Sequence, residues 1–505
     1  MGGALHLSDA FGRQNTCGSV LQRADSDFSS SCLLAGMHAV ARCAAFVVCS
    51  SFALSDFGCE AAKKRKESIM AQQFQPDHDI AFSADAVAAA SAFAAALFDD
   101  VRAISRDGEG VTREAFGPVE TKTLERIAQA GRELGLSQHT DEAGNLWLEK
   151  QGASPELPMV VLGSHADSVP EGGNFDGLAG IAAGLAALFM LKQAGVTLSR
   201  TIAVLALRGE ENSFYGKPYL GSRAILGQLG PDDLALVRRD GAKTLESAMR
   251  ACGLNPERLA AGRPLIDFST IRAFIELHIE QGPMLDMEAL NRTGIITGIR
   301  GLYSHKAIRC ERADTNAPAD AVPRATAALL VRMEKRWQAA FDAGDDLVET
   351  TGVIGPVAEP KAACIDSDDP FAPVEALQFA FDIRSLRQAT CLAFHAVLEE
   401  EAAAVGRERG VRFVFDPMLE SHPAKMDDEL RRVLHQGAAV AGVPVRDIAS
   451  GAGHDSAYFA NAGIPTAMIF VANQRGSHNP HEAMRMEDFM AGVQVLAAAL
   501  PILDA

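Results

Sequence analysis

The chain has 505 residues, 48% of them hydrophobic and 22% charged, so it is long enough for two domains with apolar cores. Its formal net charge of −18 argues against a nucleic-acid partner, because binding to phosphates normally needs a basic surface. Five of the nine cysteines lie between Cys17 and Cys59, and neither a disulfide framework nor a metal-type pairing of cysteines is evident. We therefore expect a globular, cytoplasmic protein.

The segment 1–69 differs from the remainder. Its basic cluster, Lys63 to Lys66, follows the apolar stretch at 32–54 instead of preceding it, and that stretch is interrupted by a histidine and an arginine. A signal peptide and a membrane span are therefore both poor interpretations. We expect residues 1–69 to be a disordered leader or an extension that is not native, with folding beginning near Met70, and we expect no membrane partner.

From residue 85 onward, predicted helices alternate with predicted strands. The expected elements are helices at about 85–105 and 117–134, a strand at 159–162, a helix at 178–194 that Gly195 ends, and strands at 201–207 and 465–471. This alternation predicts an α/β fold with a doubly wound, mostly parallel sheet. Ligands of such sheets bind at the carboxyl ends of the strands.

Polar side chains gather where these strands end. The candidate residues, each at or just past a predicted strand or at the start of the helix that follows it, are His165, Asp167, Asp176, Glu210, Glu211, His278 and His478. Histidine and carboxylate side chains are the donors that a hydrolytic pair of divalent ions requires. The set therefore predicts a binuclear metal site at one edge of the sheet.

Each residue type suits one task in such a site. A carboxylate between two cations offsets their repulsion, and Asp176 is suited to that bridge. His165 and His278 would complete the coordination of one ion, and Glu211 and His478 would complete that of the other. Glu210 would then take the proton from the attacking water, and Asp167 would accept the imidazole N–H of His165.

Taken one at a time, these residues have simpler interpretations. A histidine in an apolar run, such as His278, is usually a core residue, and Asp176 is a good helix N-cap. Glu210 and Glu211 alone would read as a solvated helix start. The glycines at 172–177 match a dinucleotide fingerprint poorly, which argues against NAD. Only the order and context of the whole set favour the metal site.

Five segments resemble one family closely. They are GSHADSVPEGGNFDG, RGEENSFYGKPYLGSRA, IELHIEQGPMLD, FDIRS and SGAGHDSAYFANAGIPTAMIFV with SHNPHE after it. They are similar to the N-carbamoyl-L-amino acid hydrolases, allantoate amidohydrolases and bacterial β-ureidopropionases, which belong to the binuclear metallohydrolases together with aminoacylase and carboxypeptidase G. The resemblance runs from about residue 85 to the end and does not include the segment 1–69.

The resemblance implies a catalytic domain, 70–292 and 389–505, interrupted at 293–388 by a smaller α/β sandwich that serves as lid and dimerisation domain. It implies a homodimer and the same five metal ligands, with Glu210 as general base. It also implies that Arg384 grips the substrate carboxylate and that Gln281, His454 and Asp455 lie near the substrate.

One family motif is missing from the expected lid. The family has a histidine between two glycines there, and it donates to the developing oxyanion, but the corresponding stretch, 310–324, contains no histidine. His305 precedes this stretch and is the candidate substitute if the register differs; otherwise it reads as an exposed strand histidine. The family's asparagine is likewise not identifiable at 362–366. Loss of one oxyanion donor typically costs about a hundred- to a thousandfold in turnover.

The expected function is hydrolysis of the ureido C–N bond of an N-carbamoyl-L-amino acid, which gives the amino acid, ammonia and carbon dioxide. The cofactors would be two divalent ions, zinc or manganese, with cobalt or nickel possible on the same ligands. The alternatives are an allantoate amidohydrolase, a dipeptidase or aminoacylase of the same fold, and a metal-binding homologue of impaired activity. The retained Glu210 favours an enzyme, and the missing lid histidine favours the impaired homologue.

Overall fold

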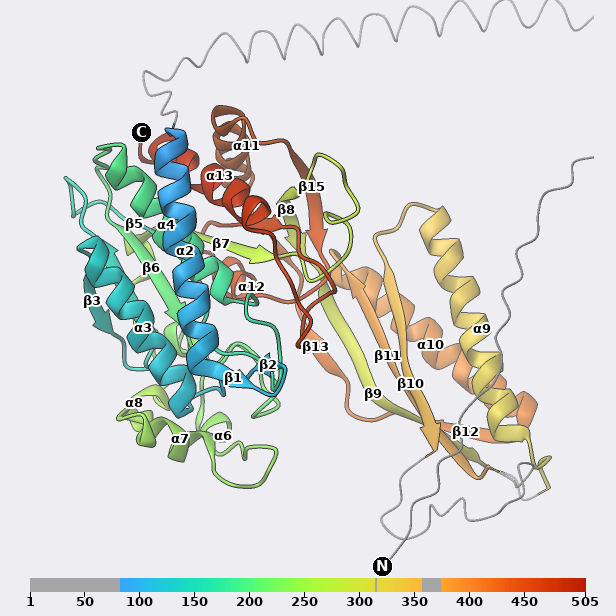
Figure 1. The fold of residues 1–505 in the computed structure, drawn as a ribbon. Helices are drawn as coiled ribbons and strands as arrows, with labels where there is room; N and C mark the ends of the chain where they lie inside the picture. Colours follow the sequence, from blue (N-terminus) through green and yellow to red (C-terminus); the bar gives the residue numbers. More distant parts are fainter. Residues whose placement is uncertain (1–81, 314–315, 357–373) are drawn as a thin grey trace, which may run out of the picture. The chain divides into compact units, whose positions relative to one another are not determined.

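The computed structural model describes residues 82–313, 316–356 and 374–505 (Figure 1). The expected leader, 1–69, and the stretch 362–366 lie outside the described residues. The described residues all belong to the compact unit Asp77–Ala505.

A nine-stranded mixed sheet forms the larger part of the fold. Its order is β14-β8-β16-β7-β5-β6-β4-β3, with β15 paired to β8. The strands are β3 Ser137–Thr140, β4 Leu146–Lys150, β5 Met159–His165, β6 Ile202–Leu207, β7 Ile271–Ile279, β8 Thr293–Ile299, β14 Ala424–Lys425, β15 Val445–Ser450 and β16 Thr466–Val471. The four central strands β16, β7, β5 and β6 are parallel, so their carboxyl ends meet at one edge.

Helices cover both faces of this sheet. Val160 and Leu162 of β5 belong to an apolar cluster with α4 (Leu178–Gln193) and α13 (Met486–Asp504), whereas Val161 belongs to one with α12 (Asp455–Asn461). This alternation follows from the two-residue period of a strand. The remaining helices of this part are α2 Ala84–Ser105, α3 Pro118–Leu134, α5 Leu220–Ile225, α6 Pro231–Leu234, α7 Leu245–Ala251, α8 Pro256–Leu259 and α11 Asp428–Ala441.

The helix α4 lies in the core and directly follows the turn that contains Asp176. It is apolar nearly all round and almost wholly buried, as expected of a helix that is covered on every side. It begins after Gly177, whose φ of +69° lies in the left-handed region, and a Cβ there would lie 2.5 Å from the His165 ring. The turn before α4 therefore requires glycine at this position.

A second, five-stranded antiparallel sheet has its own core. Its order is β10-β11-β9-β12, with β13 paired to β9. Its elements are β9 Gly301–Arg312, α9 Ala321–Asp342, β10 Val348–Pro356, β11 Ala376–Ser385, α10 Gln388–Arg409, β12 Val411–Val414 and β13 Leu419–Ser421. Both helices pack on the sheet through a separate apolar cluster that includes Leu329 and Leu398.

The strand pairings differ from expectation in two respects. The large sheet is mixed: its four central strands are parallel and β15 runs parallel to β8, but β3, β4 and β14 pair antiparallel with their neighbours and β8 runs antiparallel to β16. The smaller sheet also does not follow the expected limits of 293 and 388. β8 pairs in the large sheet, whereas α10, β12 and β13 belong with the smaller one. Only Arg300 separates β8 from β9, so the sequence reads as one strand across the change of sheet.

One described helix, α13, is long and apolar enough by length and composition to cross a membrane. In the structure 67% of the apolar stretch of this helix is buried, as in the core helix of a globular protein.

Candidate metal centre and substrate cleft

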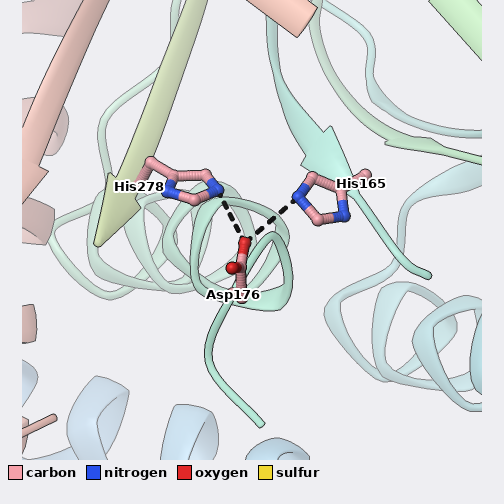
Figure 2. A group of neighbouring side chains, drawn as sticks. All are labelled: His165, Asp176 and His278. Carbon is pink, nitrogen blue, oxygen red and sulfur yellow. Dashed lines mark ion pairs between the residues drawn. The ribbon is translucent and has the colours of Figure 1, made fainter. Parts of the chain in front are cut away.

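Two histidines and an aspartate meet where β5 and β7 end (Figure 2). The Nε2 atom of His165 lies 3.3 Å from Asp176 Oδ1, and the Nε2 atom of His278 lies 3.2 Å from the same oxygen. All three side chains are buried. The structure thus brings one expected ligand group together, with both imidazoles directed at one carboxylate oxygen.

The other oxygen of Asp176 faces a second group. His478 Nε2 lies 3.2 Å from Asp176 Oδ2 and 3.1 Å from Glu211 Oε1. His478 has a φ of +59°, a conformation that a non-glycine residue adopts at a cost. Asp176 is therefore the residue shared by the two groups.

The Oδ1 atom of Asp176 is buried and has no hydrogen-bond partner among the described residues. Burial raises the pKa of Asp176, but the three nearby imidazoles outweigh it and hold the pKa well below its usual range. An ionised, buried oxygen with two imidazole nitrogens beside it fits a divalent cation. The donor set of histidine and carboxylate thus suits the metals that the sequence implies.

Asp167 joins two of the strand ends. Its carboxylate accepts the backbone N–H of Glu210 at 2.9 Å and that of Glu211 at 3.0 Å. The Nδ1 atom of His165 lies 3.2 Å from the Asp167 carbonyl oxygen and 3.4 Å from its carboxylate. The residue thus contacts His165 as expected and also fixes the loop that carries both glutamates.

Glu210 is buried beside the first group. Its Oε2 atom lies 3.9 Å from His165 Nε2. Burial raises the pKa of Glu210 well above its usual value, and Glu211 and Asp455 add to this while His165 opposes it. The side chain is therefore placed next to the donors in an environment that favours holding a proton.

A cleft of about 400 Å³ opens onto these residues. It is lined by both donor groups and Glu210, and also by His454, Gln281 and Arg384. The Nε–H of Arg384 donates to Asp382 at 2.6 Å, and another of its N–H groups donates to the carbonyl of Gly451. The guanidinium is therefore held at the cleft by its neighbours before any substrate binds.

His454 and Gln281 are placed differently. His454 is buried with its Nε2 atom 3.1 Å from Ser450 Oγ, and burial together with His278 holds its pKa well below the usual value. Gln281 donates from Nε2 to Asp176 Oδ2 at 2.8 Å. Gln281 thus contacts the shared carboxylate in addition to lining the cleft.

His305 does not line the cleft. It is buried in the smaller sheet, with Nδ1 3.1 Å from Asp416 Oδ1 and Nε2 2.9 Å from His395 Nε2. The expectation of an exposed strand histidine is therefore wrong, because the β12 to β13 connection and α10 cover the ring. Within one chain, the structure does not bring His305 to the donor groups.

Several residues of the site are not predicted by the sequence patterns. Tyr219 and Tyr458 line the cleft with ring centroids 4.7 Å apart, and Arg223 lies over the Tyr458 ring at 4.6 Å. Buried Arg113 and Glu482 contact the Asp176 turn. Glu482 stands in the SHNPHE segment, which was a usable signal, whereas no pattern around Arg113 singles it out.

Comparison with known proteins agrees with this arrangement. The model of Peptidase family M20/M25/M40 matches residues 161–501. The N-carbamoyl-L-amino acid amidohydrolase of Geobacillus stearothermophilus is 33% identical over 395 residues, which are 77% of this chain and 92% of that protein. The allantoate amidohydrolase of Escherichia coli (strain K12) is 31% identical, with 77% and 92% covered.

A solved structure is similar over nearly its whole length. The crystal structure of an amidase of the hydantoinase/carbamoylase family from Burkholderia multivorans matches with a TM-score of 0.72 at 25% identity, covering 82% of this chain and 97% of that one. The chain therefore belongs to the M20/M25/M40 peptidase family, in the amidohydrolase group that these relatives represent.

Proposed function

We propose that this protein hydrolyses the ureido C–N bond of an N-carbamoyl-L-amino acid, releasing the amino acid, ammonia and carbon dioxide. The single observation that carries the proposal is the position of Glu210, which is buried 3.9 Å from His165 in a cleft that Arg384 also lines. The identity of 33% to a carbamoyl amino acid amidohydrolase supports this substrate class.

The site would hold two divalent ions. His165 and His278 would serve one, Glu211 and His478 the other, and Asp176 both, as the distances of 3.1 to 3.3 Å among these groups suggest. Zinc or manganese suits these donors, and cobalt or nickel is compatible with them. When bound, such ions polarise a carbonyl oxygen and lower the pKa of an attacking water.

The side chains would divide the remaining work. Glu210 would accept the proton of the attacking water and pass it to the leaving nitrogen, which is the role of a general acid and base. The hydrogen bonds that the backbone N–H groups of Glu210 and Glu211 donate to the Asp167 carboxylate would keep this loop in place during the proton transfer. Arg384 would bind the α-carboxylate, and His454 and Gln281 would contact the substrate from the cleft wall.

The smaller sheet would act as the lid and dimerisation domain of a cytoplasmic homodimer. The catalytic domain would contain the large sheet, and the lid would correspond to the expected insert at 293–388, except that β8 would belong to the catalytic domain and α10, β12 and β13 to the lid. Closure of such a lid would exclude water and align the carbonyl. In a single chain His305 does not face the cleft, so His454 is the better placed donor to the substrate carbonyl.

The proposal is tested by ammonia release from the purified protein after reconstitution with zinc or manganese. The panel contains several N-carbamoyl-L-amino acids, allantoate and a dipeptide. Fast release from the carbamoyl compounds is the expected result. If ammonia were released from allantoate alone, or if the dipeptide alone were cleaved, the substrate would belong to that class and not to the carbamoyl amino acids. If folded, metal-loaded protein turned over none of the compounds, the chain would be the impaired homologue.

Replacing Arg384 with lysine should weaken the use of carboxylate substrates. Lysine keeps the charge but loses the planar fork that binds a carboxylate through two hydrogen bonds. We expect kcat/KM to fall roughly ten- to a hundredfold, the effect of one charged hydrogen bond, mainly through KM. The control is Arg387→Lys, an exposed arginine whose carboxylate partner is Asp345, which should leave both constants unchanged. If the two variants had equal kcat and KM, Arg384 would not bind the substrate carboxylate.

A further inference from the structure

Asp176 is held through its backbone as well as placed by the helix that follows it. Its carbonyl oxygen accepts from Arg113 at 3.3 Å, and its N–H donates to Glu482 Oε1 at 3.2 Å. Arg113 precedes β3 and Glu482 follows β16, so the two side chains come from parts of the chain that are far apart in sequence. Two oppositely charged side chains from distant parts of the chain thus hold one peptide segment from either side.

Arg113 makes contacts of an unusual kind for a buried cation. Its side chain is fully buried, and no carboxylate of the described residues lies within 4.0 Å of its nitrogens. Besides Asp176, its guanidinium donates to the carbonyl of Ala166 at 2.7 Å, the carbonyl of Asp167 at 3.5 Å and the side chain of Asn174 at 3.5 Å. The one cation therefore joins the end of β5 to the Asp176 turn.

Burying a charge without an ion-pair partner costs free energy, so the position of the Arg113 guanidinium needs an explanation. Burial lowers the pKa of Arg113, and the nearby carboxylates of Asp167, Glu482 and Asp176 oppose this shift only in part. Neutral side chains that pack equally well would avoid this cost but could not bind three carbonyl oxygens at once. Fixing the loop is the benefit that the arrangement offers.

Glu482 completes the arrangement and extends it to the second donor group. Its Oε1 atom also accepts the N–H of Phe175 at 2.8 Å, and its Oε2 atom accepts from Ser477 Oγ at 2.7 Å. Ser477 precedes His478, and its Oγ lies 2.5 Å from Asp176 Oδ2. One carboxylate therefore connects the turn that carries Asp176 to the loop that carries His478.

The glycine beside Glu482 supports this assignment. A Cβ at Gly173 would lie 2.1 Å from the Glu482 carboxylate carbon and Oε1, closer than side chains approach one another. The glutamate thus occupies space that only glycine leaves free. The second of the two paired glycines in the PEGGNFDG segment is therefore accounted for by a buried carboxylate from a distant part of the chain.

We propose that Arg113 and Glu482 are positioning residues that fix the direction of the Asp176 carboxylate and thereby set the affinity for both divalent ions. The proposal rests on the metal-binding part of the proposed function. Groups that orient a metal ligand typically change metal affinity about ten- to a hundredfold when they are removed. A purely structural role would lower stability without this specific effect.

The test compares metal binding with thermal stability in Arg113→Met, Glu482→Ala and a matched control. The control is Asp504→Ala, because Asp504 likewise accepts two backbone N–H groups, those of Ser199 and Arg200, at the opposite end of β6 from the donor groups. Zinc affinity is measured by competition with a chromogenic chelator, and melting temperature is measured on the metal-free protein. Arg113→Met and Glu482→Ala should raise the zinc dissociation constants at least about tenfold. Asp504→Ala should lower only the melting temperature.

Conservative variants keep the test decisive if a truncated one fails to fold. Glu482→Gln retains an acceptor for the two N–H groups, and Arg113→Lys retains the charge with fewer donors, so both should bind zinc with intermediate affinity. Zinc dissociation constants within about twofold of wild type in folded variants would overturn the positioning role. Failure of the wild-type protein to bind two zinc ions would instead overturn the proposed metal function, and the positioning role with it.

Discussion

Replacing Glu210 with glutamine should abolish most turnover and leave the metal content unchanged. Glutamine has the shape of glutamate but cannot accept a proton from water, and a lost general base costs roughly a hundred- to ten-thousandfold in rate. The backbone N–H of residue 210 would keep its bond to Asp167, so the loop should stay in place. The measurement is kcat on the best carbamoyl substrate, with metal stoichiometry determined on the same sample.

Glu211→Gln is the matched control, because it makes the same chemical change one residue away. Glu211 Oε1 lies 3.1 Å from His478 Nε2 within the second donor group, whereas Glu210 belongs to neither group in the proposed ligand set. We expect Glu211→Gln to lose affinity at one ion, and Glu210→Gln to keep both. Equal metal loss in the two variants would contradict the division of tasks between these neighbours.

Much of the site was predictable because the ligands follow the order of the strands. His165, Glu211 and His478 each lie at or after a strand whose apolar residues mark it, and the parallel arrangement of the central strands brings those ends to one edge. The five expected ligands do lie together. Their roles as ligands remain a prediction.

Other parts depended on contacts that a sequence does not express. Arg113 acts on carbonyl oxygens far along the chain, beginning with that of Ala166, and backbone acceptors leave no residue type to recognise. The change of sheet at Arg300 could not be seen in the sequence, since β8 and β9 read as one continuous strand-like stretch. His305 was misjudged because its exposure depends on the chain segment around Phe415 and on α10, and both come much later in the sequence.

Removing the Asp176 carboxylate should have the largest effect on metal binding of any single change. Asp176 Oδ1 lies within 3.3 Å of His165 and His278, and Oδ2 within 3.2 Å of His478, so both donor groups depend on it. Without it, two cations would face each other with no shared negative charge between them, and their repulsion would act against double occupancy.

We therefore expect Asp176→Ala to retain fewer than one divalent ion per chain after dialysis, whereas Glu211→Ala and His278→Ala should each retain about one. The measurement is metal content by elemental analysis of folded, zinc-reconstituted protein, with wild type at two as the reference. The three variants separate a shared carboxylate from two independent sites. If Asp176→Ala held one ion as tightly as wild type, the carboxylate would serve a single ion. The second group would then depend on the Glu211 carboxylate, which lies 3.1 Å from His478 Nε2.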